Sequence, residues 1–226
     1  MRFEILYPGS YAMAKATLAQ DEQFRAESGA MVAMSPTIDV EGKMEGGLWK
    51  ALKRKAVGGE SMFMQTLKAT RGPGEVFIAP STPGDVTLLE LNGANNYFLQ
   101  KEGFLAAESG VTLETVSQGI FKGIMSGEGV FVQRVGGQGK LLVSSFGAIH
   151  KLALAPGENY VVDNGHLVAW SGTVTYEIKK ASSGWLSSAT SGEGFVCHLT
   201  GPGDVYFQTR NAASFGQWVA SFIPAK

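Results

Sequence analysis

"SGEGVFVQRVGGQGK" at residues 126–140 and "SGEGFVCHLTGPGDV" at residues 191–205 are two versions of one pattern, and they begin 65 residues apart (191 − 126). A third, more divergent version, "GGESMFMQTLKATRGPGEV", begins at Gly58. In each, a Gly-acid turn precedes a run of apolar and β-branched residues, which is typical of a strand. A pattern that recurs at an interval of this size indicates a repeated structural unit.

The segments upstream of these turns also resemble one another. A Ser-Gly step occurs in "FRAESGAMVAM" (24–34), "FLAAESGVTLETV" (104–116) and "HLVAWSGTVTYEI" (166–178), and its glycines are Gly29, Gly110 and Gly172. "NNYFLQKEG" (95–103) and "ENYVVDNG" (158–165) precede the second and third of these segments. We therefore predict three repeats, at about 15–91, 92–153 and 154–212.

The fold class follows from the glycines and the short strand-like runs. Thirty glycines separate segments such as "EVFIAP", "KLLVSSF" and "TVTYEIK", and this pattern favours many strands joined by tight turns. A repeat of some sixty residues cannot bury both faces of its own sheet. We therefore predict an all-β protein, with residues 1–226 forming a single β-sandwich or prism in which three repeats close around a pseudo-threefold axis.

Two segments depart from the repeat. "GGLWKALKRKAVGG" (46–59) is inserted in the first repeat, and its helical pattern predicts a short basic helix within residues 46–58. "NAASFGQWVASFIPAK" (211–226) places Phe215, Trp218, Val219 and Phe222 on one helical face. With Asn211 as the N-cap and Pro224 as the stop, it predicts a helix over 212–223 that packs on the sandwich.

Composition limits the function classes. The net charge is −1, with 19 basic and 20 acidic residues, so the chain as a whole has no electrostatic reason to bind nucleic acid. Only 17% of the residues are charged, which favours a homo-oligomer. The single cysteine, Cys197, excludes an internal disulfide, and alternation in "FVCHL" predicts that it is buried. Because no long apolar segment opens the chain, we expect a cytoplasmic protein.

These strings resemble a known family. The Ser-Gly and Gly-Glu-Gly motifs, "FGAIHKLALAPGENYVVDNGHLVAW" (146–170) and "GPGDVYFQTR" (201–210) are similar to the AIM-twenty-four family, named for altered inheritance of mitochondria. The resemblance covers essentially the whole chain and implies a TRAP-like fold of tandem β motifs. No catalytic motif is established for the family, so no active-site residue is carried over. The mitochondrial setting of fungal members is not carried over either, because the chain lacks an Arg- and Ser-rich presequence.

Motifs for chemistry are weak in this sequence. There is no G-x-S-x-G elbow, and the glycine-rich "GGQGKLL" (136–142) has neither a following helix nor the Ser or Thr of a phosphate-binding loop. His150, Asp163 and His166 are weak candidates for a metal site, although histidines with ordinary structural roles are more common. We expect no enzyme activity and no cofactor.

Two sets of residues are candidate sites. The basic insertion gathers four cations beside an aromatic side chain: Lys50, Lys53, Arg54, Lys55 and Trp49. These residues form a surface for an anionic membrane or a protein partner, or a helix that only caps the sandwich. The turn acids Glu60, Glu128 and Glu193 occupy equivalent places in the repeats, and would form a ring of carboxylates if the threefold axis exists. Solvated turn acids are the simpler interpretation.

Two function classes remain open. The first is a non-enzymatic scaffold or interaction module, oligomeric and associated with a membrane. The second is a small-molecule or metal-binding β-sandwich. A concave polar pocket would favour the second class, and an exposed apolar surface would favour the first.

Overall fold

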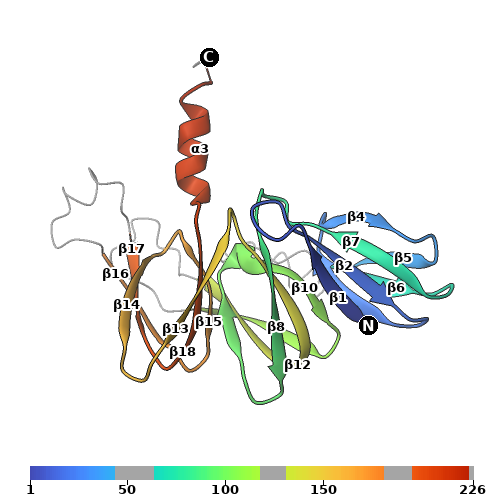
Figure 1. Cartoon of the computed structure of the whole chain (residues 1–226), viewed down its shortest axis with the longest axis horizontal. Helices are drawn as coiled ribbons and strands as arrows, with labels where there is room; N and C mark the ends of the chain where they lie inside the picture. The colour runs from blue at the N-terminus through green and yellow to red at the C-terminus, as the bar shows by residue number, and fades with distance from the viewer. Residues whose placement is uncertain (44–63, 118–130, 181–194, 224–226) are drawn as a thin grey trace.

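The structure, a computed structural model, describes residues 1–43, 64–117, 131–180 and 195–223. Within these ranges it contains eighteen β-strands, one 3₁₀-helix and one α-helix, so the predicted all-β class is confirmed. The strands form sheets of four, eleven and three strands (Figure 1). The helix predicted at 46–58 lies outside the described residues, whereas the C-terminal helix forms as α3 (Ala212–Ala220).

The first strand set spans residues 2–78. Its strands are β1 (Arg2–Leu6), β2 (Met13–Leu18), β3 (Gln23–Glu27), β4 (Met31–Met34), β5 (Ile38–Lys43), β6 (Met64–Ala69) and β7 (Gly74–Ile78). One layer is the four-stranded sheet β1-β2-β7-β4, and the other contains β3, β6 and β5. Alternate residues of β2, Ala14, Ala16 and Leu18, are buried in one cluster with Phe24 and Leu67 of the facing layer.

The second strand set spans residues 86–144, and the third spans residues 149–208. The second contains β8 (Val86–Asn92), β9 (Tyr97–Leu99), the 3₁₀-helix η1 (Lys101–Gly103), β10 (Phe104–Glu108), β11 (Val111–Ser117) and β12 (Phe131–Ser144). The third contains β13 (Ile149–Leu154), β14 (Asn159–Asp163), β15 (Leu167–Ser171), β16 (Thr175–Lys180), β17 (Phe195–Thr200) and β18 (Gly203–Gln208).

The three sets share one pattern of strand pairing. We name six positions a to f in chain order: β2–β7 in the first set and β13–β18 in the third. In the second set β8–β11 are a to d, and the two halves of β12 are e and f. In every set strands a and c flank f, while b and d flank e, and all of these pairs are antiparallel.

The link between strands e and f explains why β12 is so long. In the first set Pro73 stands in this link, and in the third set Pro202 does, and proline cannot donate to a strand ladder. The second set has "GGQG" (136–139) at this place, without proline. Glycine lets the backbone bend while pairing continues, so β12 runs unbroken for 14 residues.

The sets are joined to each other through strands b and c. Strand b of the first set, β3, pairs with strand c of the second, β10. Strand b of the second set, β9, pairs with strand c of the third, β15. At this second junction the side chain of Asn96 lies directly against Gly172, where a Cβ would be 1.4 Å from Asn96 Oδ1. These two junctions connect the sets into the eleven-stranded sheet.

The pairing corrects one sequence-based equivalence. Gly29 lies between strands b and c, whereas Gly110 and Gly172 follow strand c. The true counterpart of Ser171-Gly172 is Ser35-Pro36, because residues 19–41 align without a gap with residues 155–177, at a constant offset of 136 (155 − 19). The hydroxyls confirm this, since Ser35 Oγ accepts from Glu75 N (2.9 Å) and Ser171 Oγ from Asp204 N (3.0 Å). The first alignment failed because β3, which is a strand b, is followed by the same Ser-Gly step as β10 and β15, which are strands c.

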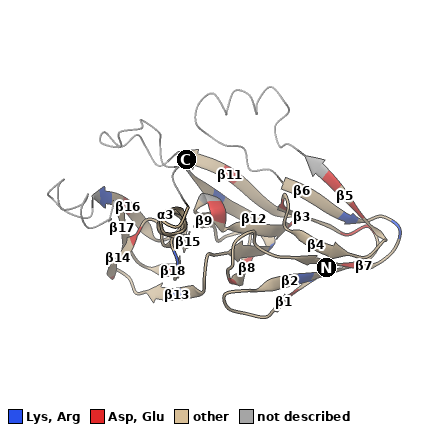
Figure 2. Cartoon of the chain, turned by 90° about the horizontal axis from the view of Figure 1, so that it is seen from above, with Lys and Arg blue, Asp and Glu red and all other residues tan. Residues whose placement is uncertain are grey.

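The strands do not close into the expected ring. Closure around one axis would bring β14, in the third set, against β4, in the first, but these strands belong to different sheets. In the views of Figures 1 and 2 they lie at opposite ends of the molecule. The buried apolar residues likewise form three clusters, one centred on each set, rather than a single axial core.

The third cluster is built around Trp170 on β15. This side chain is fully buried, and its ring stacks on Phe98 (centroids 5.7 Å apart) and on Tyr176 (4.6 Å). Because Phe98 belongs to the second set and Tyr176 to the third, Trp170 packs across the junction between the two sets. Such aromatic contacts add to the stabilisation that burial itself provides.

Trp170→Ala should therefore lower the free energy of unfolding by about 3–5 kcal/mol, because it removes a large buried side chain and leaves a cavity. The matched control is Trp218→Ala, which truncates an exposed tryptophan of α3 and should change stability little. Urea unfolding followed by circular dichroism measures both. Equal effects of the two substitutions would contradict the placement of Trp170.

Candidate interaction surface

Helix α3 begins directly after the last strand. Asn211 is its N-cap, with the side-chain oxygen accepting from Ala213 N (2.9 Å) and Ser214 N (3.2 Å). This cap satisfies amides that would otherwise lack partners at the start of the helix. Both the position of the helix and the capping residue agree with the sequence prediction.

The sequence prediction that this helix packs on the sandwich is wrong. Figure 1 shows α3 projecting away from the sheets, and none of its residues is buried. Among the described residues, the ring of Phe215 is the only one of the helix that contacts an aromatic ring of the body, that of Phe146, at 5.2 Å between centroids. The chain leaves β18 heading outward, so the apolar face has no sheet beneath it. Amphipathic spacing indicates that a face needs cover, but not what provides it.

The exposed face of the helix is apolar and aromatic. The large exposed side chains of α3 and of the turn that follows it, which we call the α3 surface, are Phe215, Trp218, Val219, Phe222 and Ile223. The rings of Trp218 and Phe222 contact each other at 5.1 Å between centroids. Residues 211–223 contain no Asp, Glu, Lys or Arg, and α3 is accordingly free of red and blue in Figure 2. Contact with an apolar surface would therefore bury no charge.

A hollow of about 250 Å³ lies at the base of α3. Its polar lining residues come from the end of β12, from β18 and from the segments around η1, β15 and α3: Gln100, Glu102, Ser144, Asn164, Gln208 and Asn211. The amides bind groups of the protein itself. Gln100 Nε2 donates to Asn164 Oδ1 (3.1 Å), and Gln208 donates to Gly165 O (3.1 Å) while accepting from Phe146 N (2.7 Å). These groups are already used, so the hollow offers a ligand few free polar groups.

Glu102 also acts on a carboxyl group of the neighbouring set. Glu27, at the end of β3, has a raised pKa, first because it is half-buried and second because of the negative charge of Glu102. Two acids beside a junction favour the neutral form of one of them. This pair serves no catalytic constellation that we can identify in the described residues.

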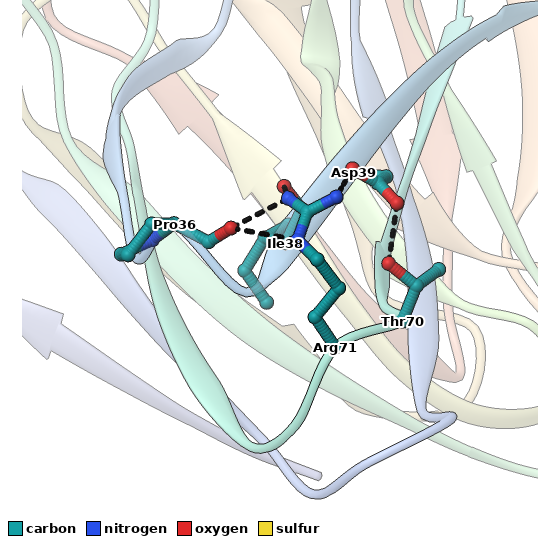
Figure 3. Close-up of polar contacts among 5 residues, drawn as sticks. All are labelled: Pro36, Ile38, Asp39, Thr70 and Arg71. Carbon is teal, nitrogen blue, oxygen red and sulfur yellow. Dashed lines mark hydrogen bonds and ion pairs between the residues drawn. The ribbon is translucent and has the colours of Figure 1, made fainter.

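Arg71 fixes the turn that follows β4. Its guanidinium donates to Pro36 O through Nε (3.1 Å) and Nη2 (2.5 Å), and Nη1 pairs with Asp39 Oδ1 (2.6 Å) (Figure 3). The hydroxyl of Thr70 donates to the other carboxylate oxygen of Asp39. Hydrogen bonds from Thr70 and Arg71 lower the pKa of Asp39. A fork of this kind holds the turn in one geometry.

The residues singled out from the sequence are only partly within the described residues. The basic set Lys50, Lys53, Arg54, Lys55 and Trp49 and the turn acids Glu60, Glu128 and Glu193 all lie outside them. His150 is exposed, with its ring 4.9 Å from that of Phe207, and His166 Nδ1 lies 2.7 Å from Gln208 O. Asp163 Oδ1 accepts from Gly165 N (2.8 Å). In the described ranges, no three His, Cys, Asp or Glu residues are placed to hold a metal.

Cys197 is buried in the third cluster, as predicted from the alternation in its strand. Its Sγ lies 3.3 Å from Asn164 Oδ1 and 3.7 Å from the Tyr176 hydroxyl. Burial raises the pKa of the thiol to about 11. Because the thiolate is the reactive form, this cysteine is suited to packing and not to nucleophilic chemistry.

The fold is that of an all-β protein with three strand sets and a projecting terminal helix. The family model for "Mitochondrial biogenesis AIM24" matches residues 3–210, and the chain belongs to this family. The Streptococcus pyogenes serotype M6 protein M6_Spy0233, described as uncharacterised, is 33% identical over 99% of this chain and 92% of its own length.

Two further proteins are similar to this chain. The crystal structure of protein SPYM3_0169 from Streptococcus pyogenes matches with a TM-score of 0.82 at 31% identity, covering 98% of this chain and 99% of that one. "Altered inheritance of mitochondria protein 24, mitochondrial" from the fungus Verticillium alfalfae is 26% identical over 75% of this chain, but this match spans only 43% of the fungal protein. The family resemblance read from the sequence is thereby confirmed.

The buried thiol should resist modification in the native protein. At pH 8 a pKa near 11 instead of about 8.5–9 lowers the thiolate fraction about 100-fold, and packing adds steric protection. We expect no colour from a chromogenic thiol reagent under native conditions and one equivalent in denaturant. Because the pKa of Cys197 is higher in the folded than in the unfolded protein, the thiol contributes to stability at pH values below its unfolded pKa. That stability is lost as the pH rises through the pKa of the folded protein. Rapid native labelling would contradict the burial.

Proposed function

We propose that this protein is a non-enzymatic interaction module that docks on a membrane surface through the α3 surface. The observation that carries the proposal is the exposed, uncharged and aromatic face of a helix that projects from the sheets. Within the described residues, no helix is both long and apolar enough to cross a bilayer, so the contact we propose is interfacial. Trp and Phe side chains are enriched at this depth of a bilayer.

The binding free energy expected for the α3 surface suits weak and reversible docking on a membrane. Full burial of a large apolar side chain is worth about 1.5–3 kcal/mol, so partial burial of the five residues of the α3 surface would favour binding by several kcal/mol. The Asn211 cap supports a helix that is formed before docking, which reduces the ordering cost. The basic residues Lys50, Lys53, Arg54 and Lys55 would add about 1 kcal/mol each near anionic lipid. Their contribution stays a prediction.

A small molecule in the hollow beneath α3 is the weaker alternative. The volume of about 250 Å³ lies below the range of about 300–1,000 Å³ that is usual for ligand pockets. Its amides are also bonded to the protein itself. The small volume and the bonded amides both favour a structural role for the hydrogen bonds that line the hollow.

We further propose that the body of the module is a threefold repeat of one β unit, in the manner of TRAP-like folds. The shared a-to-f pairing supports this relation. So do matching contacts at equivalent places: Lys15 pairs with Glu75 (2.6 Å) in the first set, and Lys151 pairs with Asp204 (2.9 Å) in the third. The two lysines lie 136 residues apart (151 − 15), which is the offset of the gapless alignment.

Co-sedimentation with lipid vesicles tests the membrane role. The double variant Trp218→Gln/Phe222→Gln should bind phosphatidylcholine–phosphatidylglycerol vesicles about tenfold more weakly, or worse, because two apolar side chains no longer enter the lipid. Glutamine keeps the helix propensity high. The matched control is Val40→Gln, which removes an exposed apolar side chain from β5, a strand that lies away from α3 in Figures 1 and 2, and should bind as the unmodified chain does.

Vesicles of phosphatidylcholine alone form the second arm of this experiment. Weaker binding to them, with the difference abolished by charge reversal at Lys50, Lys53 and Arg54, would support the basic segment. No sedimentation with either kind of vesicle would reject the membrane role and leave a protein partner as the occupant of the α3 surface.

A further inference from the structure

In the part of the chain that the structure describes, two strands lack the neighbour that their counterparts have. Strand b of the first set pairs with strand c of the second, and strand b of the second pairs with strand c of the third. This series leaves out strand c of the first set, β4, and strand b of the third set, β14. Among the described residues β4 pairs only with β7, and β14 pairs only with β17.

The side chains of β4 are exposed where their counterparts are buried. Val32 is 59% exposed, whereas the equivalent Leu105 of β10 and Val168 of β15 are 0% and 3% exposed. The equivalence rests on a register shift that occurs at the same place in all three strands, between Met31 and Ala33 in β4. Because β10 and β15 pair on both sides despite this shift, it does not prevent β4 from doing so.

The same contrast holds on β14. Tyr160 is 43% exposed, while its counterpart on β3, Phe24, is fully buried beside the first junction. Val161, the next residue, is also exposed. Exposed apolar edge strands are uncommon, since proteins usually protect them with charges, especially lysine. Neither β4 nor β14 contains a lysine or an arginine.

We propose that copies of this chain associate head to tail, with β14 of one copy pairing antiparallel with β4 of the next. The occupant is a second copy because the two free edges are the two halves of a junction that the chain already makes twice. At the existing junctions Phe98 lies opposite Trp170, and Arg25 lies opposite Ala107. The equivalent register places Val161 of one copy opposite Met34 of the next.

The remaining positions follow from the same register. Leu99 lies opposite Ala169 and Tyr97 opposite Ser171, so Val162 would face Ala33 and Tyr160 would face Ser35. One hydrogen bond of the internal junction would be missing, because Gly172 N donates to Asn96 O (2.9 Å) and its counterpart on the β4 side is Pro36, which has no N–H. Arg71 holds this turn in place before any partner arrives.

The association differs from a symmetric dimer, because the two contacting surfaces are different. A heterologous contact of this kind leads to a ring if the rotation closes and to a filament if it does not. It does not depend on the proposed membrane role, since neither β4 nor β14 belongs to the α3 surface.

Molar mass measured by light scattering over a wide range of concentration tests the proposal. The unmodified chain should give multiples of the single-chain mass. Val32→Lys and Val161→Lys, each placing a charge on one free edge, should each give single chains. Val32→Lys keeps an intact β14 and Val161→Lys keeps an intact β4, so an equimolar mixture should form dimers and grow no further.

Val40→Lys is the matched control, because it places the same charge on an exposed valine of another edge strand, β5, and should leave the assembly unchanged. Circular dichroism checks that each variant folds. An unmodified chain that stays monomeric would overturn the proposal. So would loss of assembly in only one of the two edge variants, which indicates a symmetric contact, or a mixture that stays monomeric.

Discussion

Hydrogen bonding between strand edges is the constraint on which the architecture depends. Each strand set is a small two-layer unit, and a unit of this size buries too little apolar surface to be stable alone. Pairing of β3 with β10 and of β9 with β15 joins all three sets into one eleven-stranded sheet. It also covers apolar residues such as Phe24 and Trp170 that would otherwise face water. The junctions therefore supply both continuity of the sheet and burial.

Hydrogen bonding between strand edges also distinguishes the two surfaces that we propose for binding, the strand edges of β4 and β14 and the α3 surface. The free edges of β4 and β14 offer backbone groups and a few apolar side chains in a fixed register, which selects a partner of matching geometry. The α3 surface offers aromatic side chains without directional polar groups, which suits a surface with no fixed pattern. Head-to-tail copies related by one repeated operation would each carry such a helix, and several weak contacts would then act together.

The sequence predicted the strand-rich class and the terminal helix, since each depends on local spacing of apolar residues, glycines and caps. It misplaced the first repeat by one strand, because "FRAESG" imitates "FLAAESG" although the gapless match is with "ENYVVDNG". It could not predict that α3 projects or that, among the described residues, β4 and β14 each pair on one side only. Those outcomes depend on contacts between distant segments, and the spacing within either segment does not encode them. The basic segment around Lys53 was the strongest candidate site in the sequence and lies outside the described residues.

The unbroken course of β12 has a mechanical consequence. Through Leu141 and Leu142 it holds β10, which carries the first set, and through Gln133 and Arg134 it holds β9, which carries the third. Both flanking sets are thus joined to one continuous strand. In the other two sets a proline interrupts the strand at the equivalent place. A force that pulls the first and third sets apart would therefore pass through β12.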